Sequence, residues 1–320
     1  MQHTLSAAVS IHKTPNKQVK QINSMKNYIF ILAFLLTLLD SCKKNDVKDN
    51  VESCYSNFNV QTIVHDGINR EYVLYSPNSY NGTSSLPVLF NFHGFGGSAS
   101  KFMNEADMRA VAESDPFILV YPQGSCLNGS SHWNACPSGG NNKSNADDFD
   151  FAESIISEIS SQYNVDMERI YAVGYSNGGM MAYGLANYKS DLIAAVASVS
   201  GVMLDCLGST NHPMPVVHLH GTSDDVIPYD GNSDFNSAQN TVDHWINFNN
   251  TITTPTVSSD NSGGMSIEHF AYTQGDQSVA VEHYKFIEGE HVWFNATYQG
   301  QNTAELIWNF VSKYDINGLR

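Results

Sequence analysis

Hydrophobic residues along the chain form short continuous runs that alternate with stretches of helical spacing. The continuous runs predict buried strands at 86–92, 117–121, 170–174, 194–199 and 216–220, followed by strand-like runs at 267–273 and 279–286. The helical spacing predicts helices at 101–113, 149–163, 178–188, 237–248 and 304–314. A hairpin precedes these elements, because Asp66-Gly67 stands between two β-rich runs. Apolar strands separated by helices indicate an α/β fold, with a mostly parallel central sheet and helices on both faces.

The N-terminal region has a different pattern. An apolar run at 28–39 follows Met25-Lys26, and it is shorter than the roughly 20 apolar residues that cross a bilayer. The run is typical of a secretory signal peptide. Cys42 comes directly after it and predicts a lipoprotein signal, in which Cys42 becomes the lipidated first residue. A buried helix and an ordinary signal peptide are the alternatives, and Met25 is a candidate start.

This interpretation divides the chain into three parts. They are an N-terminal extension with its signal peptide (1–41), a flexible polar tether (42–56) and one large domain (57–316), which no repeat or linker interrupts. We expect a secreted protein, either a cell-surface or a periplasmic lipoprotein, that contacts the membrane only through the lipid anchor at Cys42. We also expect it to be a monomer.

Acidic residues outnumber basic ones in the chain. There are 16 Lys and Arg against 32 Asp and Glu, which gives a net charge of −16. The predicted leader holds four Lys and one Asp, so its removal makes the remainder more acidic still. Such a surface repels phosphate backbones, and we therefore expect no nucleic-acid partner.

Four cysteines remain beyond Cys42, an even number that suits disulfides in an oxidising compartment. They are Cys54, Cys126, Cys136 and Cys206, and they allow three pairings. We favour Cys126–Cys136, which closes a short loop, together with Cys54–Cys206; buried free thiols are the alternative. Their spacings match no zinc-binding pattern.

The segment 174–178 reads Gly-Tyr-Ser-Asn-Gly and fits the G-x-S-x-G pattern. A predicted strand precedes it and a predicted helix follows, which is the setting of a nucleophile elbow. The glycines permit the tight turn that exposes the Ser176 hydroxyl. We predict Ser176 as a nucleophile; an ordinary glycine turn is the alternative.

A serine hydroxyl needs a base to take its proton, and in this arrangement the expected chain order is serine, acid, histidine. His244 falls within a predicted helix, and His269 and His283 fall within predicted strands, so we interpret these three as structural. His291 follows the last strand, in a loop that can bring its imidazole to Ser176. We predict His291 as the base.

The acid is expected in the loop that follows the strand at 216–220. Asp224 is our choice, because an acid there can hold the tautomer of His291 and stabilise the imidazolium. Asp225 and Asp205 are the alternatives.

Acyl transfer also needs donors aimed at the developing oxyanion. The backbone N–H of Asn177 follows the nucleophile, and a second donor is expected in the glycine-rich loop at 93–97, where Phe95 N–H is our candidate.

In combination, several motifs resemble the secreted polyhydroxybutyrate-depolymerase-like esterases, a group in the α/β-hydrolase superfamily that also contains feruloyl and acetylxylan esterases of carbohydrate esterase family 1. These motifs are Asn-Phe-His-Gly at 91–94, Asn-Val-Asp at 164–166, the segments at 174–183, 220–224 and 226–229, and His-Val-Trp at 291–293. The resemblance runs from about 59 to 314. It implies the α/β-hydrolase fold and a triad of Ser176, Asp224 and His291.

The resemblance further implies a serine carboxylesterase that works through an acyl-enzyme. Export favours feruloyl or acetylxylan ester groups of plant polysaccharide as substrate, and polyester depolymerisation is the alternative. A non-catalytic binding protein on a hydrolase scaffold is an alternative of another class, although such proteins usually lose a triad member.

Two further features bear on ligands. Trp133 could stack on a sugar or an aromatic acid, or could pack to anchor its loop, and Tyr175 beside the nucleophile is expected to contact substrate. The acidic segment 147–150 suits a helix N-terminus better than a calcium site. No cofactor fingerprint occurs, so we expect neither a cofactor nor a metal.

Overall fold

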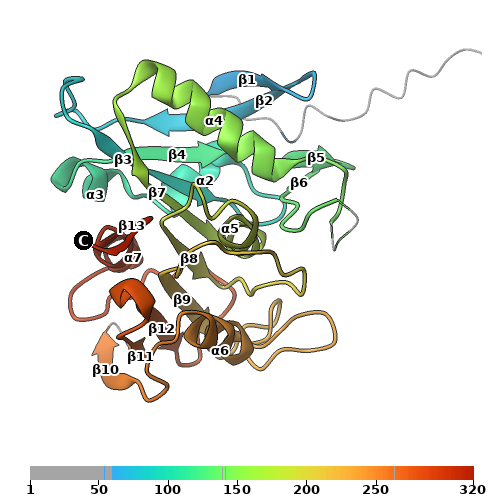
Figure 1. Cartoon of the computed structure of the whole chain (residues 1–320). Helices are drawn as coiled ribbons and strands as arrows, with labels where there is room; N and C mark the ends of the chain where they lie inside the picture. Colours follow the sequence, from blue (N-terminus) through green and yellow to red (C-terminus); the bar gives the residue numbers. More distant parts are fainter. Residues whose placement is uncertain (1–53, 55–59, 139, 141, 263) are drawn as a thin grey trace, which may run out of the picture. The chain divides into compact units, whose positions relative to one another are not determined.

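A ten-stranded sheet forms the centre of the computed structural model, which describes residue 54 and residues 60–138, 140, 142–262 and 264–320 (Figure 1). In spatial order its strands are β1 (Gln61–His65), β2 (Ile68–Tyr75), β4 (Ile118–Pro122), β3 (Leu86–Phe92), β7 (Val165–Tyr175), β8 (Ala195–Val199), β9 (Val216–Gly221), β12 (Val281–Phe286), β11 (Met265–Tyr272) and β10 (Thr256–Ser262). The six strands from β4 to β12 are parallel, and the strands outside them are antiparallel. The predicted α/β class is confirmed.

Helices cover both faces of this sheet. They are α2 (Ala99–Glu105), α3 (Arg109–Ser114), α4 (Asp148–Gln162), α5 (Asn177–Tyr188), α6 (Ala238–Phe248) and α7 (Thr303–Val311). Alternate strand side chains point to opposite faces. On β3, Leu89 packs with α2, α3 and α7, whereas Val88 and Phe90 pack with α4, α5 and α6. Because both faces are buried, the central strands read as continuous apolar runs.

The helix predicted at 101–113 is wrong in one respect, since two helices occupy this region. Ala106, Asp107 and Met108 separate α2 from α3. The buried Tyr121 hydroxyl donates to the carbonyl of Ala106 at 2.6 Å and lies 3.4 Å from the amide of Met108. A side chain bonded to these backbone groups replaces the helical ladder at the break.

The polar segment between β4 and α4, for which the sequence predicts no strand, contains a short hairpin. Its strands are β5 (Ser125–Leu127) and β6 (Ser130–His132), joined by Asn128-Gly129, both with positive φ. Asn-Gly between two strands is itself a hairpin signal. The strand β10 was missed for another reason: it is a polar edge strand that pairs only with β11, so no apolar run marks it.

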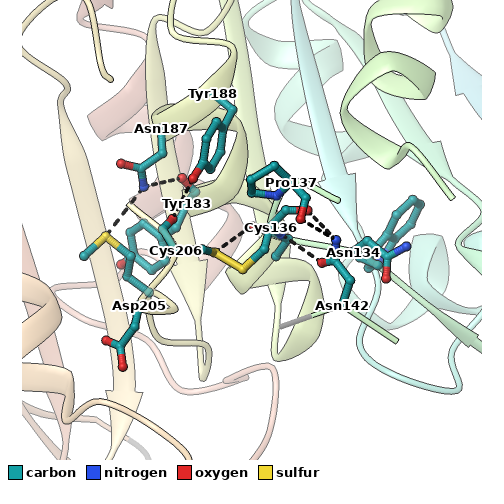
Figure 2. Close-up of a disulfide and its surroundings, with 12 residues drawn as sticks. Asn134, Cys136, Pro137, Asn142, Tyr183, Asn187, Tyr188, Asp205 and Cys206 are labelled. Atoms are coloured by element: carbon teal, nitrogen blue, oxygen red, sulfur yellow. Dashed lines mark hydrogen bonds between the residues drawn. A yellow bond between two sulfur atoms is a disulfide. The ribbon is translucent and has the colours of Figure 1, made fainter. Parts of the chain in front are cut away.

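Two disulfides correct the predicted pairing. Cys54 bonds to Cys126, and Cys136 bonds to Cys206, so each bridge links segments about 70 residues apart. Figure 2 shows the second of these bridges. The expectation of Cys126–Cys136 and Cys54–Cys206 is wrong. Proximity in sequence was a poor guide, because Cys126 lies on the β5–β6 hairpin whereas Cys136 lies in the next loop, against the segment that follows β8.

The disulfides indicate that the chain folds in an oxidising compartment outside the cytoplasm. The predicted signal peptide, Cys42 and almost all of the predicted tether lie outside the described residues. Within the described part of the chain, no helix combines the length and apolar character needed to span a bilayer.

Candidate active site

Ser176 occupies a sharp turn between β7 and α5. Its φ of 54° and ψ of −120° lie in a region that non-glycine residues rarely adopt. Two glycines make the turn possible: a Cβ on Gly178 would lie 2.0 Å from the carbonyl oxygen of Phe92, and a Cβ on Gly174 would lie 2.2 Å from Gly178. The backbone N–H of Ser176 donates to the Val199 carbonyl at 2.8 Å, which fixes the turn to β8.

The three residues of the predicted triad lie in one hydrogen-bonded line. The Oγ of Ser176 lies 2.9 Å from Nε2 of His291, and Nδ1 of His291 lies 2.7 Å from Oδ2 of Asp224. They come from loops after β7, β12 and β9, which all end at the same edge because these strands are parallel. Since Asp224 can only accept, Nδ1 carries the proton and Nε2 is free to take one from Ser176.

The carboxylate of Asp224 is buried and well supplied with donors. Its Oδ1 accepts the backbone N–H groups of Val226 and Ile227 at 2.9 and 2.8 Å. Burial opposes its ionisation, but hydrogen bonds from His220, His291 and Ile227 outweigh burial and lower the pKa of this carboxyl. The alternative acids are placed elsewhere: Asp205 accepts from Asn236 at 2.7 Å, and Asp225 is exposed, whereas Nδ1 of His291 is paired with Asp224.

The loop after β3 presents the predicted second oxyanion donor. The carbonyl of Gly94 lies 2.7 Å from Nδ1 of His93 and accepts from the amide of Gly97 at 3.0 Å. In a trans peptide the N–H points opposite to the C=O, so Phe95 N–H points away from these donors. A Cβ on Gly94 would lie 3.3 Å from Cβ of Ser176, which places this peptide beside the nucleophile. The role of Phe95 N–H and Asn177 N–H stays a prediction.

His93 orients that peptide, a role that the sequence interpretation missed. Its Nε2 accepts the backbone N–H of Gly124 at 3.0 Å, so Nδ1 carries the proton and donates to Gly94. Burial lowers the pKa of His93 to about 4, and its imidazole is therefore neutral at physiological pH.

Trp133 is 1% exposed, so its ring has no face to offer a substrate. Its Nε1 donates to the carbonyl of His93 at 2.9 Å, and its ring packs edge-on against Phe92. The backbone of Trp133 is paired twice with the side-chain amide of Asn177, at 2.8 and 3.1 Å. The substrate-stacking prediction for Trp133 is wrong; the residue anchors the loop against the start of α5.

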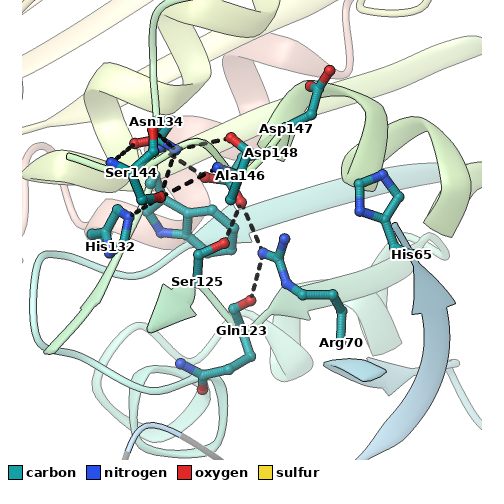
Figure 3. Close-up of polar contacts among 12 residues, drawn as sticks. His65, Arg70, Gln123, Ser125, His132, Asn134, Ser144, Ala146, Asp147 and Asp148 are labelled. Atoms are coloured by element: carbon teal, nitrogen blue, oxygen red, sulfur yellow. Dashed lines mark hydrogen bonds and ion pairs between the residues drawn. The ribbon is translucent and has the colours of Figure 1, made fainter. Parts of the chain in front are cut away.

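A buried ion pair holds the next residue of this loop (Figure 3). Asp148 accepts the backbone N–H of Asn134 at 2.8 Å, and its other oxygen accepts from Arg70 at 2.8 Å and from Ser125 at 3.1 Å. Arg70 and Asp148 are both buried. The loop is thus fixed on one side to α5, which carries Asn177, and on the other to the start of α4.

The acidic segment at the start of α4 is engaged within the protein. Asp147 is the N-cap of α4 and accepts from the amide of Asp150, whose carboxylate lies 3.1 Å from Nε2 of His65. Across the described residues, no group of three or more metal-binding side chains occurs.

Comparison with known proteins identifies the family. The model of the esterase PHB depolymerase family matches residues 70–251, which is more than half of the chain. The chain belongs to this family. The match includes the loop at 93–97, Ser176 and Asp224, and the fold continues beyond it to His291.

Curated relatives of this family member include an acetylxylan esterase and a feruloyl esterase. A bifunctional acetylxylan esterase/xylanase of Neocallimastix patriciarum is 28% identical over 257 residues, covering 79% of this chain and 34% of the relative. Feruloyl esterase B of Piromyces equi is 26% identical over 265 residues, covering 77% of this chain and 46% of the relative. The chain therefore spans between a third and a half of the length of these relatives.

Solved structures of esterases share the family member's α/β-hydrolase fold. The acetyl xylan esterase from Aspergillus awamori superposes with a TM-score of 0.56 at 14% identity, covering 79% of this chain and 98% of that chain. The feruloyl esterase module from Clostridium thermocellum gives a TM-score of 0.53 at 12% identity, covering 79% of this chain and 85% of that chain.

Within this family member, Tyr175 contacts His291, the predicted base. Its hydroxyl donates to the backbone carbonyl of His291 at 2.8 Å, and the two ring centres lie 5.1 Å apart. Burial raises the pKa of Tyr175 to about 12, so the hydroxyl remains a donor. Tyr175 thus supports the loop of His291, and its contact with substrate stays a prediction.

Proposed function

We propose that this protein is a secreted serine carboxylesterase that hydrolyses esters through an acyl-enzyme. The observation that carries the proposal is the line from Ser176 Oγ through His291 to Asp224, with separations of 2.9 and 2.7 Å. Family membership and the esterases among its relatives support the same reaction.

In the first step Ser176 attacks the ester carbonyl while Nε2 of His291 takes its proton. Asp224 holds Nδ1–H of His291 and stabilises the imidazolium that forms. The oxyanion accepts from the N–H groups of Asn177 and Phe95. The alcohol leaves with the proton from His291, and water then cleaves the acyl-enzyme with the same groups in the same roles.

The substrate we propose is an acylated plant polysaccharide with feruloyl or acetyl groups. Two relatives are named as acetylxylan and feruloyl esterases, and exposed apolar side chains lie close in sequence to the residues of the site. Phe95 is the predicted oxyanion donor, Val226 lies two residues after Asp224 and Val292 follows His291, and these three are 55%, 55% and 40% exposed. Exposed apolar side chains suit the ring of an aromatic acid better than they suit a charged group.

We also propose that Cys42 carries a lipid that attaches the enzyme to a membrane. Its position directly after an apolar run of signal-peptide length supports this. Mass spectrometry of the mature N-terminus tests it: a diacylglyceryl group on Cys42 is expected, and an unmodified chain that begins elsewhere contradicts it.

Release of ferulate and acetate from feruloylated, acetylated arabinoxylan tests the enzyme assignment, with Ser176→Ala as the matched control. We expect wild type to release at least one acid and the variant to lose at least about 10³-fold in kcat, because the nucleophile is gone. If the wild type cleaves a short-chain aryl ester but releases neither ferulate nor acetate from arabinoxylan, the substrate to test next is a polyester.

A second outcome separates an enzyme from a non-catalytic binding protein. An organophosphonate probe is expected to label wild type at Ser176 and to leave Ser176→Ala unlabelled. Absence of labelling, with no hydrolysis of any ester tried, would refute the esterase proposal.

A further inference from the structure

His220 lies directly behind the proposed catalytic acid. It is the penultimate residue of β9, and its side chain has no exposed surface. Its Nε2 lies 2.9 Å from the carbonyl oxygen of Ile227 and 3.3 Å from Oδ2 of Asp224. Both neighbours are acceptors, so Nε2 must carry the proton of the neutral ring.

The turn from Asp224 to Ile227 is held from two sides. Oδ1 of Asp224 accepts the N–H groups of Val226 and Ile227, which closes the turn on itself. His220 lies on the other side: its Nε2 donates to the carbonyl of Ile227 at 2.9 Å and lies 3.3 Å from the remaining oxygen of Asp224. That oxygen, Oδ2, is the one that accepts Nδ1–H of His291.

The ring of His220 also stacks on His218, with ring centres 5.3 Å apart, and meets Tyr229 edge-on at 5.9 Å, but these contacts do not decide where its N–H points. Its Nδ1 has no hydrogen-bond partner among the described residues. A buried polar atom without a partner has a free-energy cost. The position of the ring therefore supplies a donor, Nε2–H, to the turn at Asp224, although it leaves Nδ1 unpaired.

We propose that His220 is a positioning residue of the triad: its Nε2–H fixes the turn 224–227 and holds Oδ2 of Asp224 in line with His291. The proposal rests on the proposed esterase function, and it adds a fourth side chain to the Ser176, His291 and Asp224 line. His220 acts through Asp224 and does not touch the substrate.

His218 supplies a matched comparison. It precedes His220 by two residues on β9, is equally buried, and lies with its Nδ1 2.8 Å from the hydroxyl of Tyr183. Its ring stacks on that of His220, but its Nδ1 is paired with Tyr183 rather than with Asp224. If the buried histidines of this strand only stabilise the fold, substitutions of His218 and of His220 should have the same effect on kcat.

Two amide variants test the proposal because they differ by one methylene. In His220→Gln the side-chain nitrogen can reach the place of Nε2, whereas in His220→Asn it can reach only the place of Nδ1. We expect His220→Gln to keep kcat within about threefold and His220→Asn to lose about tenfold or more, as for loss of a hydrogen bond to a charged group. The KM for a short-chain aryl ester is expected to stay within about twofold in both, because the contact is remote from bound substrate.

His218→Asn is the control, with thermal melting of each variant as the measure of folding. We expect it to lose stability and to retain kcat. Equal kcat in His220→Gln and His220→Asn, whether both are lowered or both retained, would overturn the proposal. If His220→Asn does not fold, His220→Gln decides alone: retained kcat supports the role, and a tenfold loss overturns it.

Proton NMR gives a readout that does not depend on turnover. The Nδ1 proton of His291, hydrogen-bonded to Asp224, is expected far downfield in wild type and in His220→Gln, and lost or shifted upfield in His220→Asn. An unchanged resonance in His220→Asn overturns the proposal. If wild type hydrolyses no ester, the esterase proposal fails, and this resonance still decides whether His220 orients Asp224.

Discussion

At the scale of single residues, His93 shows how a side chain can act through the backbone. It donates from Nδ1 to the carbonyl of Gly94, and the opposite end of the same peptide is the N–H of Phe95. The donor that we expect to bind the oxyanion is therefore oriented before substrate arrives. Preorganised donors of this kind are a large part of catalysis, because they need no rearrangement during the reaction.

Replacing His93 with Leu removes this orientation. We expect kcat to fall by about tenfold or more with KM little changed, approaching the 100- to 1,000-fold loss that follows removal of an oxyanion donor. His93→Asn is the control, since its amide can donate near the place of Nδ1. The affinity for a boronic acid, which mimics the tetrahedral intermediate, should fall in parallel with kcat. A boronate affinity that stays at the wild-type value in His93→Leu would contradict the role.

The residues of the site differ in how far sequence could predict them. Ser176 could be found because the strand–glycine–helix context is local, and Asp224 and His291 because each follows a predicted strand in the expected order. His220 and His93 could not be assigned, because their roles depend on which acceptor lies opposite a ring nitrogen. Trp133 was misjudged because a polar loop gave no sign that its ring would be buried.

At the scale of elements, the segment around Trp133 joins two helices that flank the site. Asn177 at the start of α5 binds one residue of the segment, and Asp148 at the start of α4 binds the next. Arg70 from β2 completes the link by pairing with Asp148. The position of α5, which presents Ser176, is thus coupled to a buried charge pair.

Asp148→Ala should be strongly destabilising because it leaves the buried guanidinium of Arg70 without a counter-charge, with the carbonyl of Gln123 still accepting from it. Breaking a buried pair costs about 3–5 kcal/mol, and we expect the free energy of unfolding in urea to fall by about that amount. The neighbouring Asp147→Ala is the control: it removes only the N-cap of α4, for about 1 kcal/mol. A similar fall in the free energy of unfolding in the two variants would show that the ion pair contributes no more to stability than the N-cap does.

The elements themselves were largely predictable, and the failures have local causes. The parallel strands β3, β4, β8 and β9 are buried along their whole length, and so are residues 170–174 of β7, which is why these stretches form mostly apolar runs in the sequence. The polar edge strand β10 lacks such a run, and the break between α2 and α3 depends on the hydroxyl of Tyr121, which arrives from another strand. Tertiary contacts of this kind leave no periodic mark in the sequence.

At the scale of the whole molecule, two disulfides cross-link segments that lie far apart in the chain. Cys54–Cys126 spans 72 residues and Cys136–Cys206 spans 70. The pairing could not be read from spacing, since four cysteines permit three pairings and only the folded chain selects one.

Replacing both Cys136 and Cys206 with Ser should lower stability through the unfolded state. Closing a loop of this length lowers the conformational entropy of the unfolded chain, which raises its free energy by about 4 kcal/mol. We expect the free energy of unfolding to fall by about that amount in the variant. Chemical denaturation with and without a reductant checks it, because reduced wild type should lose more than the variant. A variant as stable as oxidised wild type would contradict the expectation.

Buried neutral histidines also link the stability of the whole molecule to pH. Burial lowers the pKa of His93 and of His283 to about 4, and that of His218 well below its ordinary value. The unfolded chain takes up protons on these rings near pH 6.5, whereas the folded protein does so only at lower pH. Asp224 has a lowered pKa too, but its contribution is lost only below the ordinary range of a carboxyl.

The sign of the histidine effect follows from proton uptake. Between pH 6.5 and 4 the unfolded state binds more protons, so the free energy of unfolding must fall as the pH falls, by about 1.4 kcal/mol per pH unit for each such histidine. We expect urea unfolding of wild type to weaken steeply over this interval and to be nearly flat from pH 7 to 8. His283→Gln removes one of these rings. It should therefore lower the slope of the free energy of unfolding against pH by about 1.4 kcal/mol per pH unit, which corresponds to one proton. An equal slope in wild type and His283→Gln would mean that the ring is already charged in the folded protein, which its burial beside the carbonyl of His218 and the hydroxyl of Tyr229 argues against.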